Sequence, residues 1–292
     1  SITAREILDK GASRIEQELA GQPAIQATLM ETMGTVYTSL GLYDPALALV
    51  SQAYDKRRAL WGPDHAEVAS SLNHLGEVLR LRSDYDAAEQ KLREALAVRR
   101  VLFGDSSPEV AATLSVLAVV LSDKGEAAAG EPLIREALEI RRRIRGDVHA
   151  DVAESIEDLG VNYYDRGEYE KAETYLREAL AMRRQLHGTK HPALAQSMDN
   201  LAWALMDLGR WAEAEPLTRL ALEMKRSLYG ETHPETAIGL NNLAYVLEGQ
   251  GSYAAAEAAY RESLAVNRQL LGESHPTIAL TMSNLAFVTY AN

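Results

Sequence analysis

Five histidines occupy equivalent places along the chain, and their side chains could coordinate a metal or transfer protons. They are His65, His149, His191, His233 and His275. A zinc ion holds its nitrogen ligands at about 2.1 Å, whereas equivalent residues of a stacked array lie roughly a repeat apart and cannot converge. Catalysis does not need five copies of one base either. We therefore expect a helix-entry residue, whose ring bonds to local backbone or packs against the preceding helix.

Other motifs of catalytic, cofactor-binding or metal-binding sites are missing from the sequence. The chain has no cysteine, which excludes disulfides, thiolate catalysis and cysteine-based zinc sites. No glycine-rich phosphate loop follows a strand pattern, and Asp64-His65 and the scattered serines have no third group placed by spacing. Carboxylate pairs such as Glu157-Asp158 are expected to lie side by side on a solvated helix face. We expect no metal, no cofactor and no enzymatic activity.

Composition and charge narrow the classes of partner. The 292 residues include 42 acidic and 30 basic side chains, a net charge of -12. This balance argues against nucleic acid as a partner, because such binders need a basic surface. The longest apolar run, Val110 to Leu121, is too short to span a bilayer, so we expect no membrane insertion. We expect a cytoplasmic location, with an extracytoplasmic domain of a larger protein as the alternative.

The sequence repeats itself every 42 residues. A small residue recurs at this interval after an apolar one, and an alanine always stands seven positions before it. A fixed period of this length is the signature of a repeat architecture, so the whole chain is predicted to be one array. The small residues are Gly34, Gly76, Ala118, Gly160, Ala202, Ala244 and Ala286. The alanines are Ala27, Ala69, Ala111, Ala153, Ala195, Ala237 and Ala279.

Each repeat contains two amphipathic patterns with helical spacing. In residues 191–232, Met198, Leu201 and Leu205 lie on one stripe of a first helix. A second helix ends at Gly230, and a proline opens the first turn of the next helix, where its missing N–H costs nothing. Because one pair of helices cannot bury its apolar face alone, neighbouring pairs must stack into an α-solenoid.

The period sets the expected boundaries of the repeats. A final unpaired helix is expected at 275–292, and residues 2–19 fill the slot of a second helix and should cap the N-terminal end. Since the chain stops where a partner helix is due, we expect it to be a fragment of a longer protein. The six predicted helix pairs lie near residues 23–64, 65–106, 107–148, 149–190, 191–232 and 233–274.

These units resemble the tetratricopeptide repeat. The matching residues are Leu201-Ala202 in the first helix, Gly209-Arg210-Trp211 at the turn, and Ala214 and Ala221 in the second helix. The 42-residue length with LNNLA and LGxxHP looks like the kinesin-light-chain type. The opening TAREILDKGASRIEQELAGQP is similar to segments before such repeats in large bacterial signalling proteins such as serine/threonine kinases. The resemblance implies an all-α, right-handed superhelix of antiparallel helix pairs.

The family resemblance further implies that the first helix of each pair lines a concave surface that grips an extended peptide. Carried onto this sequence, that surface is acidic and bears amides and aromatic rings. The expected groove residues are Glu157, Asp158, Tyr164, Asp199, Asn200, Trp203, Asn241, Asn242, Tyr245, Asn284 and Phe287. A separate apolar groove pocket is expected from Ala112, Val116 and Val119. The alternative is that the rings fill space between neighbouring helices.

The expected groove suits a protein or peptide partner with basic and apolar residues. Asparagine amides can bond a peptide N–H and C=O together, aromatic rings supply buried anchors, and carboxylates favour lysine or arginine. We expect a non-enzymatic interaction module that acts as a scaffold or regulatory part of a larger protein. A second hypothesis is a ligand-gated sensor that binds a small peptide or metabolite and changes its superhelical pitch.

The third repeat departs from the pattern. Ala127 stands where the other repeats carry an aromatic residue, and Gly130 stands where they carry alanine. Losing a buried ring weakens packing between two helices, so we expect the array to bend most easily here. The alternative is another contact that compensates for the missing ring.

Overall fold

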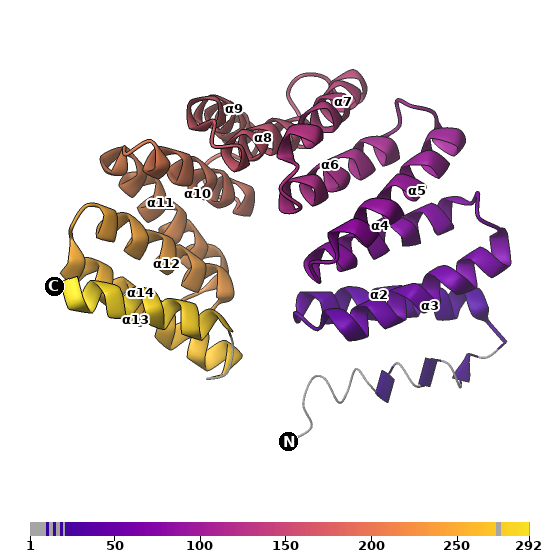
Figure 1. The fold of residues 1–292 in the computed structure, drawn as a ribbon, viewed down its shortest axis with the longest axis horizontal. Coiled ribbons are helices and arrows are strands. Elements are labelled where there is room, and N and C mark those ends of the chain that lie inside the picture. The colour runs from indigo at the N-terminus through magenta and orange to yellow at the C-terminus, as the bar shows by residue number, and fades with distance from the viewer. Residues whose placement is uncertain (1–9, 12–13, 16–17, 20, 273–275, 292) are drawn as a thin grey trace. The chain divides into compact units, whose positions relative to one another are not determined.

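The protein is described from a computed structural model that covers residues 10–11, 14–15, 18–19, 21–272 and 276–291. These residues form helices and no strand, and the two helices of each pair run antiparallel (Figure 1). No helix in this part of the chain is both long and apolar enough to cross a membrane. The expected capping helix at 2–19 lies largely outside the described residues, as does His275.

Two kinds of helix alternate along the chain. The first of each pair, here called an A helix, spans 16 or 17 residues, and the second, a B helix, spans 19. The A helices are α2 (Pro23–Ser39), α4 (Ala66–Leu81), α6 (Pro108–Asp123), α8 (Ala150–Asp165), α10 (Pro192–Asp207), α12 (Pro234–Gly249) and α14 (Pro276–Ala291). The B helices are α3 (Tyr43–Trp61), α5 (Tyr85–Phe103), α7 (Ala127–Arg145), α9 (Tyr169–His187), α11 (Trp211–Tyr229) and α13 (Tyr253–Leu271). The all-α class of antiparallel helix pairs is therefore confirmed.

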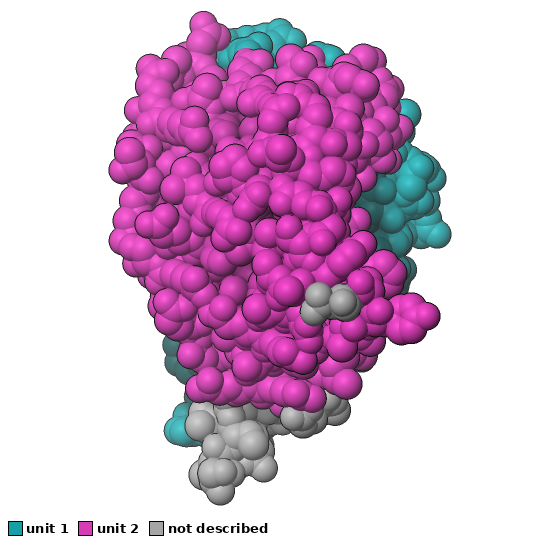
Figure 2. All heavy atoms as spheres, turned by 90° about the vertical axis from the view of Figure 1, so that its left-hand side faces the viewer, with its two compact units in different colours: residues 1–144 teal, residues 145–292 magenta. Residues whose placement is uncertain are grey.

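The chain divides into two compact units, shown in teal and magenta in Figure 2. Unit 1 comprises residues 1–144 and unit 2 residues 145–292. The division falls at the end of α7, the B helix of the repeat whose sequence departs from the pattern. Within unit 2, each B helix packs against its own A helix and against the A helix that follows. Neighbouring A helices, α8 with α10 and α10 with α12, also touch.

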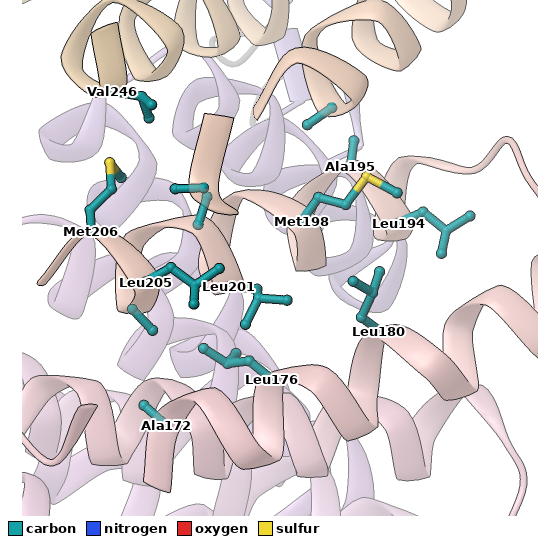
Figure 3. Close-up of a cluster of buried hydrophobic side chains, with 14 of the residues drawn as sticks. Ala172, Leu176, Leu180, Leu194, Ala195, Met198, Leu201, Leu205, Met206 and Val246 are labelled. Atoms are coloured by element: carbon teal, nitrogen blue, oxygen red, sulfur yellow. The ribbon is translucent and has the colours of Figure 1, made fainter. Parts of the chain in front are cut away.

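The core of unit 2 lies between its A and B helices. Figure 3 shows Leu176 of α9 beneath Leu201 and Leu205 of α10, with Leu180 and Met198 beside them. All five side chains are buried. Removing leucine side chains as enclosed as these typically costs about 2–5 kcal/mol each. This core fixes the position of the opposite side of the A helices, where the candidate site lies.

The recurring small residue marks the closest approach of the two helices in a pair. A Cβ added to Gly160 would lie 2.7 Å from Cγ of Leu176 on the partner helix, and one added to Gly76 would lie 2.5 Å from Cγ of Leu92. These distances are shorter than carbon atoms tolerate, because the optimal separation is about 3.5–4.0 Å. Glycine is therefore needed at these two positions, and the small side chain of Ala202 is almost fully buried at the equivalent place.

Candidate functional site

The recurring histidines begin the A helices. Nδ1 of His191 accepts a hydrogen bond from the backbone N–H of Ala193 at 3.1 Å, and His65, His149 and His233 accept the equivalent bond. The ring of His191 also stacks on His187, with centroids 3.8 Å apart. The side chain thus satisfies one of the free N–H groups of a helix start, and Ser107 does the same through its hydroxyl. Both of the expected contacts, with local backbone and with the preceding helix, are present.

Two of the carboxylates predicted to line the groove are buried instead. Glu157 is 8% exposed and pairs with Arg183 of α9, 2.7 Å from Nη1 to Oε2. The hydroxyl of Ser197 donates a further bond to Glu157 at 2.6 Å. Burial raises the pKa of Glu157 in spite of these partners. The prediction that Glu157 faces a ligand was therefore wrong, because the cation of a neighbouring B helix draws the side chain into the packing.

The same correction applies one repeat later. Asp199 is 3% exposed, and the ammonium group of Lys225 lies 2.8 Å from its Oδ2. Burial raises the pKa of Asp199 as well. Lys225 also pairs with Glu235 at 3.1 Å, so it joins α10, α11 and α12. Asn242 is 7% exposed and is likewise enclosed rather than on the groove surface.

A signal for these buried pairs exists in the sequence. Basic residues recur every 42 positions near the end of the B helices, at Arg57, Arg99, Arg141, Arg183 and Lys225. Arg57 pairs with Glu31 and donates to Ser71 at 2.7 Å, which is the arrangement of Arg183 with Glu157 and Ser197. A cation that lies 26 residues after a carboxylate and 14 before a hydroxyl therefore marks a structural pair. An interpretation based on the A helices alone does not detect this pair, because the cation lies on a B helix.

Three predicted groove residues meet around one cavity of unit 2. The cavity has a volume of about 400 Å³ and lies between α8, α9 and α10. Tyr164, Asn200 and Trp203 contribute to its wall, together with Val161, Asp165 and Leu176. Burial, together with a hydrogen bond to Asp207, raises the pKa of the Tyr164 hydroxyl, so this phenol stays neutral near pH 7.

Asn200 stands between the cavity and the buried pair. Its Oδ1 accepts a bond from the side chain of Gln196 at 2.9 Å, and its amide also bonds to Glu157. An asparagine side chain offers two donors and two acceptor lone pairs. These two bonds leave one donor and one acceptor site of Asn200, which is one of the residues that line the cavity.

The aromatic residues extend from the cavity toward α12. The ring of Trp203 lies 5.2 Å from that of Tyr245, which in turn lies 6.0 Å from Trp211. Tyr245 keeps 37% of its surface exposed, whereas Trp203 is half-buried. The rings thus pack between neighbouring helices and also form part of the surface.

The remaining predicted residues lie apart from this cavity. Asp158 on α8 and Asn241 on α12 are half-buried, and on α14 Asn284 is half-buried while Phe287 is 56% exposed. In unit 1, Ala112 and Val119 of α6 are exposed, whereas Val116 packs against the core. The structure thus brings together part of the predicted set.

The sequence matches the family model described as tetratricopeptide repeat over residues 25–101, 109–185, 157–227, 204–269 and 235–291. No curated protein is significantly similar to the chain.

Solved structures are similar to the chain in fold. BtubC (BKLC) from P. vanneervenii is 24% identical, with a TM-score of 0.63 over 78% of this chain and 93% of that one. A putative kinesin light chain with TPR-like repeats from Podosopora anserina is 18% identical, with a TM-score of 0.58 over 72% and 99%. A Rap protein complexed with Competence and Sporulation Factor is 16% identical, with a TM-score of 0.63 over 90% and 75%.

Proposed function

The chain belongs to the tetratricopeptide repeat family, a family of protein–protein interaction scaffolds, and from that premise we propose that unit 2 binds an extended segment of a partner protein. The cavity between α8, α9 and α10 is the observation that carries this proposal. In this role the chain serves as a scaffold or regulatory part of a larger protein.

The size and lining of the cavity suit one large apolar side chain. Ligand pockets typically measure about 300–1,000 Å³ and are lined mainly by apolar groups with a few polar ones. Here Val161, Leu176 and the two aromatic rings supply the apolar wall. Aromatic residues in such places are the usual anchors of an interface.

Polar groups at the wall suit the backbone beside that anchor. The available donor and acceptor of Asn200 match the C=O and N–H of an extended peptide. Asp165 lines the same cavity. The preference for basic residues, expected above from carboxylates that include the buried Glu157 and Asp199, stays a prediction.

One neighbour in fold supports the idea of a held partner. The similar Rap structure is a complex with Competence and Sporulation Factor. Another protein of similar fold therefore forms a complex with such a factor.

The test is selection of binding peptides from a random display library on the intact chain, followed by affinity measurement. We expect the selected peptides to lose about tenfold or more in affinity for Trp203→Ala, as for a hot-spot residue. Val161→Asp, which places a charge in the cavity at a partly exposed position, should weaken binding as well.

Trp61→Ala is the matched control, because Trp61 is a partly exposed tryptophan of unit 1, outside the cavity. Circular dichroism verifies that each variant is folded. Peptides that bind Trp203→Ala and Val161→Asp as tightly as the unaltered chain would overturn the proposal.

A further inference from the structure

The 42-residue period identifies a place in unit 1 that is equivalent to the cavity of unit 2, two repeats earlier. There the neighbouring A helices are α4 and α6, which touch each other. Of the residues at the cavity wall, Val161, Tyr164, Asn200 and Trp203 have as their equivalents Glu77, Arg80, Val116 and Val119. Together with Asp123, the equivalent of Asp207, these residues of unit 1 are here called the α4–α6 surface.

The α6 side of this surface consists of small apolar side chains. Val119 stands where unit 2 has Trp203, and Val116 stands where it has Asn200. Val119 is 37% exposed, and Val116 is half-buried against the core. This side therefore offers aliphatic groups to a ligand, without the ring and the amide that line the cavity of unit 2.

The α4 side carries a carboxylate at a position where no other repeat has a charged residue. In α2, α8 and α10 an acid pairs with a cation near the end of a B helix. At the equivalent position α4 has Asn73, and the acid Glu77 stands four residues later. Four residues are about one helical turn, so the acid of α4 is displaced from the place of the buried pair to the α4–α6 surface.

The half-buried carboxylate of Glu77 bonds to a neutral group. Its Oε1 accepts a hydrogen bond from Nδ2 of Asn73 at 2.9 Å. The B-helix cation of this repeat, Arg99, donates from Nη1 to Oδ1 of Asn73 at 3.3 Å and to Oγ1 of Thr113 at 2.6 Å. Asn73 thus stands between Arg99 and Glu77. In the part of the chain that the structure describes, no lysine or arginine forms an ion pair with Glu77.

The cations near Glu77 do not compensate for its burial. His74, Arg80 and Arg99 favour the charged form, yet burial raises the pKa of Glu77 above its usual value. Arg80 is itself paired with Asp123 of α6, 2.8 Å from Nη1 to Oδ2. Since an opposite charge within about 4–6 Å favours a carboxylate, a further cation at the second oxygen of Glu77 would be stabilised there.

We propose that the α4–α6 surface is a second binding site, which takes a lysine or arginine side chain of a partner protein. The cationic head pairs with Glu77. The aliphatic stem lies over Val116 and Val119, as the stems of long basic side chains do on apolar surfaces. This site selects its ligand by charge, whereas the cavity of unit 2 takes an apolar anchor, and it does not depend on the function proposed for that cavity.

Two short synthetic peptides test the site by NMR titration of the intact chain. One is acetyl-Ala-Lys-Ala-Lys-Ala-amide, and in the other both lysines are acetylated at Nε, which removes their charge and keeps their stems. We expect the lysine peptide to shift the methyl signals of Val116 and Val119. It should also bind about tenfold tighter than the acetylated peptide, because a hydrogen bond to a charged group is the stronger kind.

Variants assign the preference to Glu77. Glu77→Gln keeps an acceptor for Asn73 and removes the charge, so it should be as stable as the unaltered chain and bind both peptides equally. Val119→Lys should abolish binding of the lysine peptide, because its own ammonium group competes for the carboxylate. Glu94→Gln is the matched control and should change the affinity little, since it removes the same charge from a pair with Lys91 on α5. Circular dichroism and thermal unfolding verify that each variant is folded.

Several outcomes would overturn the second site. They are unshifted Val116 and Val119 signals, equal affinity of the unaltered chain for the two peptides, and undiminished binding of the lysine peptide to Glu77→Gln. A Glu77→Gln variant of lower stability would show that the carboxylate serves the packing instead. Trp203→Ala should leave binding of the lysine peptide unchanged, because Trp203 belongs to unit 2. Loss of binding in that variant would place the peptide at the cavity of unit 2 and not at Glu77.

Discussion

The recurring histidines could be mistaken for metal ligands or acid–base groups, but those that the structure describes act as helix caps. Each described member uses Nδ1 to accept a backbone N–H, and His65, His191 and His233 also stack on the ring four residues earlier. The segment Gly-x-x-His thus joins the end of one repeat to the start of the next. It recurs because the junction between repeats recurs.

His191→Ala should destabilise the chain by about 1 kcal/mol, the usual cost of losing a helix cap. His191→Ser should retain most of the stability, because Ser107 caps the equivalent helix through its hydroxyl. Urea unfolding followed by circular dichroism measures both variants. An unfolding midpoint that falls on addition of EDTA would contradict the capping role and indicate a metal.

The buried pair of Glu157 and Arg183 is stabilising only while both partners are present. Arg183→Met should cost about 3–5 kcal/mol, because Glu157 is left as an uncompensated buried charge. The double variant Glu157→Leu/Arg183→Met should recover most of that loss. Arg184→Met, at the exposed neighbouring residue, is the control and should change the free energy of unfolding little. A double variant as unstable as Arg183→Met alone would show that the pair is not the cause.

At the scale of the element, the two helices of a pair fit together because a small residue on one helix faces a large residue on the other. Gly160 on α8 leaves room for Leu176 on α9, and Gly76 leaves room for Leu92. The helix α7 differs, because it carries Gly130 where α5, α9, α11 and α13 carry a buried alanine. We therefore expect replacement of the same residue type to have opposite consequences in the two helices.

Gly130→Ala should stabilise the chain by about 0.5–1 kcal/mol, the difference between glycine and alanine inside a helix. Gly160→Ala should instead destabilise it by about 1–3 kcal/mol, because the added methyl group overpacks against Leu176. Thermal unfolding of the two single variants compares the signs. Stabilisation by both would mean that α8 and α9 separate more easily than their packing indicates.

At the scale of the whole molecule, each of the two units has hydrophobic clusters of its own. Those of unit 2 contain residues from Tyr163 to Val288. Those of unit 1 contain residues up to Ile140. Stability in repeat proteins is close to a sum of local contributions from repeats and their nearest neighbours, so such a division has consequences for folding.

Residues 145–292 expressed alone should fold and unfold cooperatively, as judged by helical circular dichroism and a single thermal transition. A fragment that starts at residue 199 is the matched control, because it divides α10 and removes Leu194, Met198 and the residues of α9 from the core of unit 2. It should be far less helical per residue. A disordered 145–292 fragment would show that unit 2 depends on the rest of the chain.

The sequence alone was sufficient to predict the 42-residue period and the alternation of two helices. These features are local, because helical spacing of apolar residues defines which side of a helix is buried. Only the tertiary structure decided that Glu157 and Asp199 are buried, because both lie at the edge of the buried side of their helices. Whether a carboxylate at this edge faces solvent or the helix packing depends on a cation of the neighbouring B helix, 26 residues away in the sequence. The cavity beside Trp203 and the division into two units depend in the same way on contacts between helices, which the spacing within one helix does not contain.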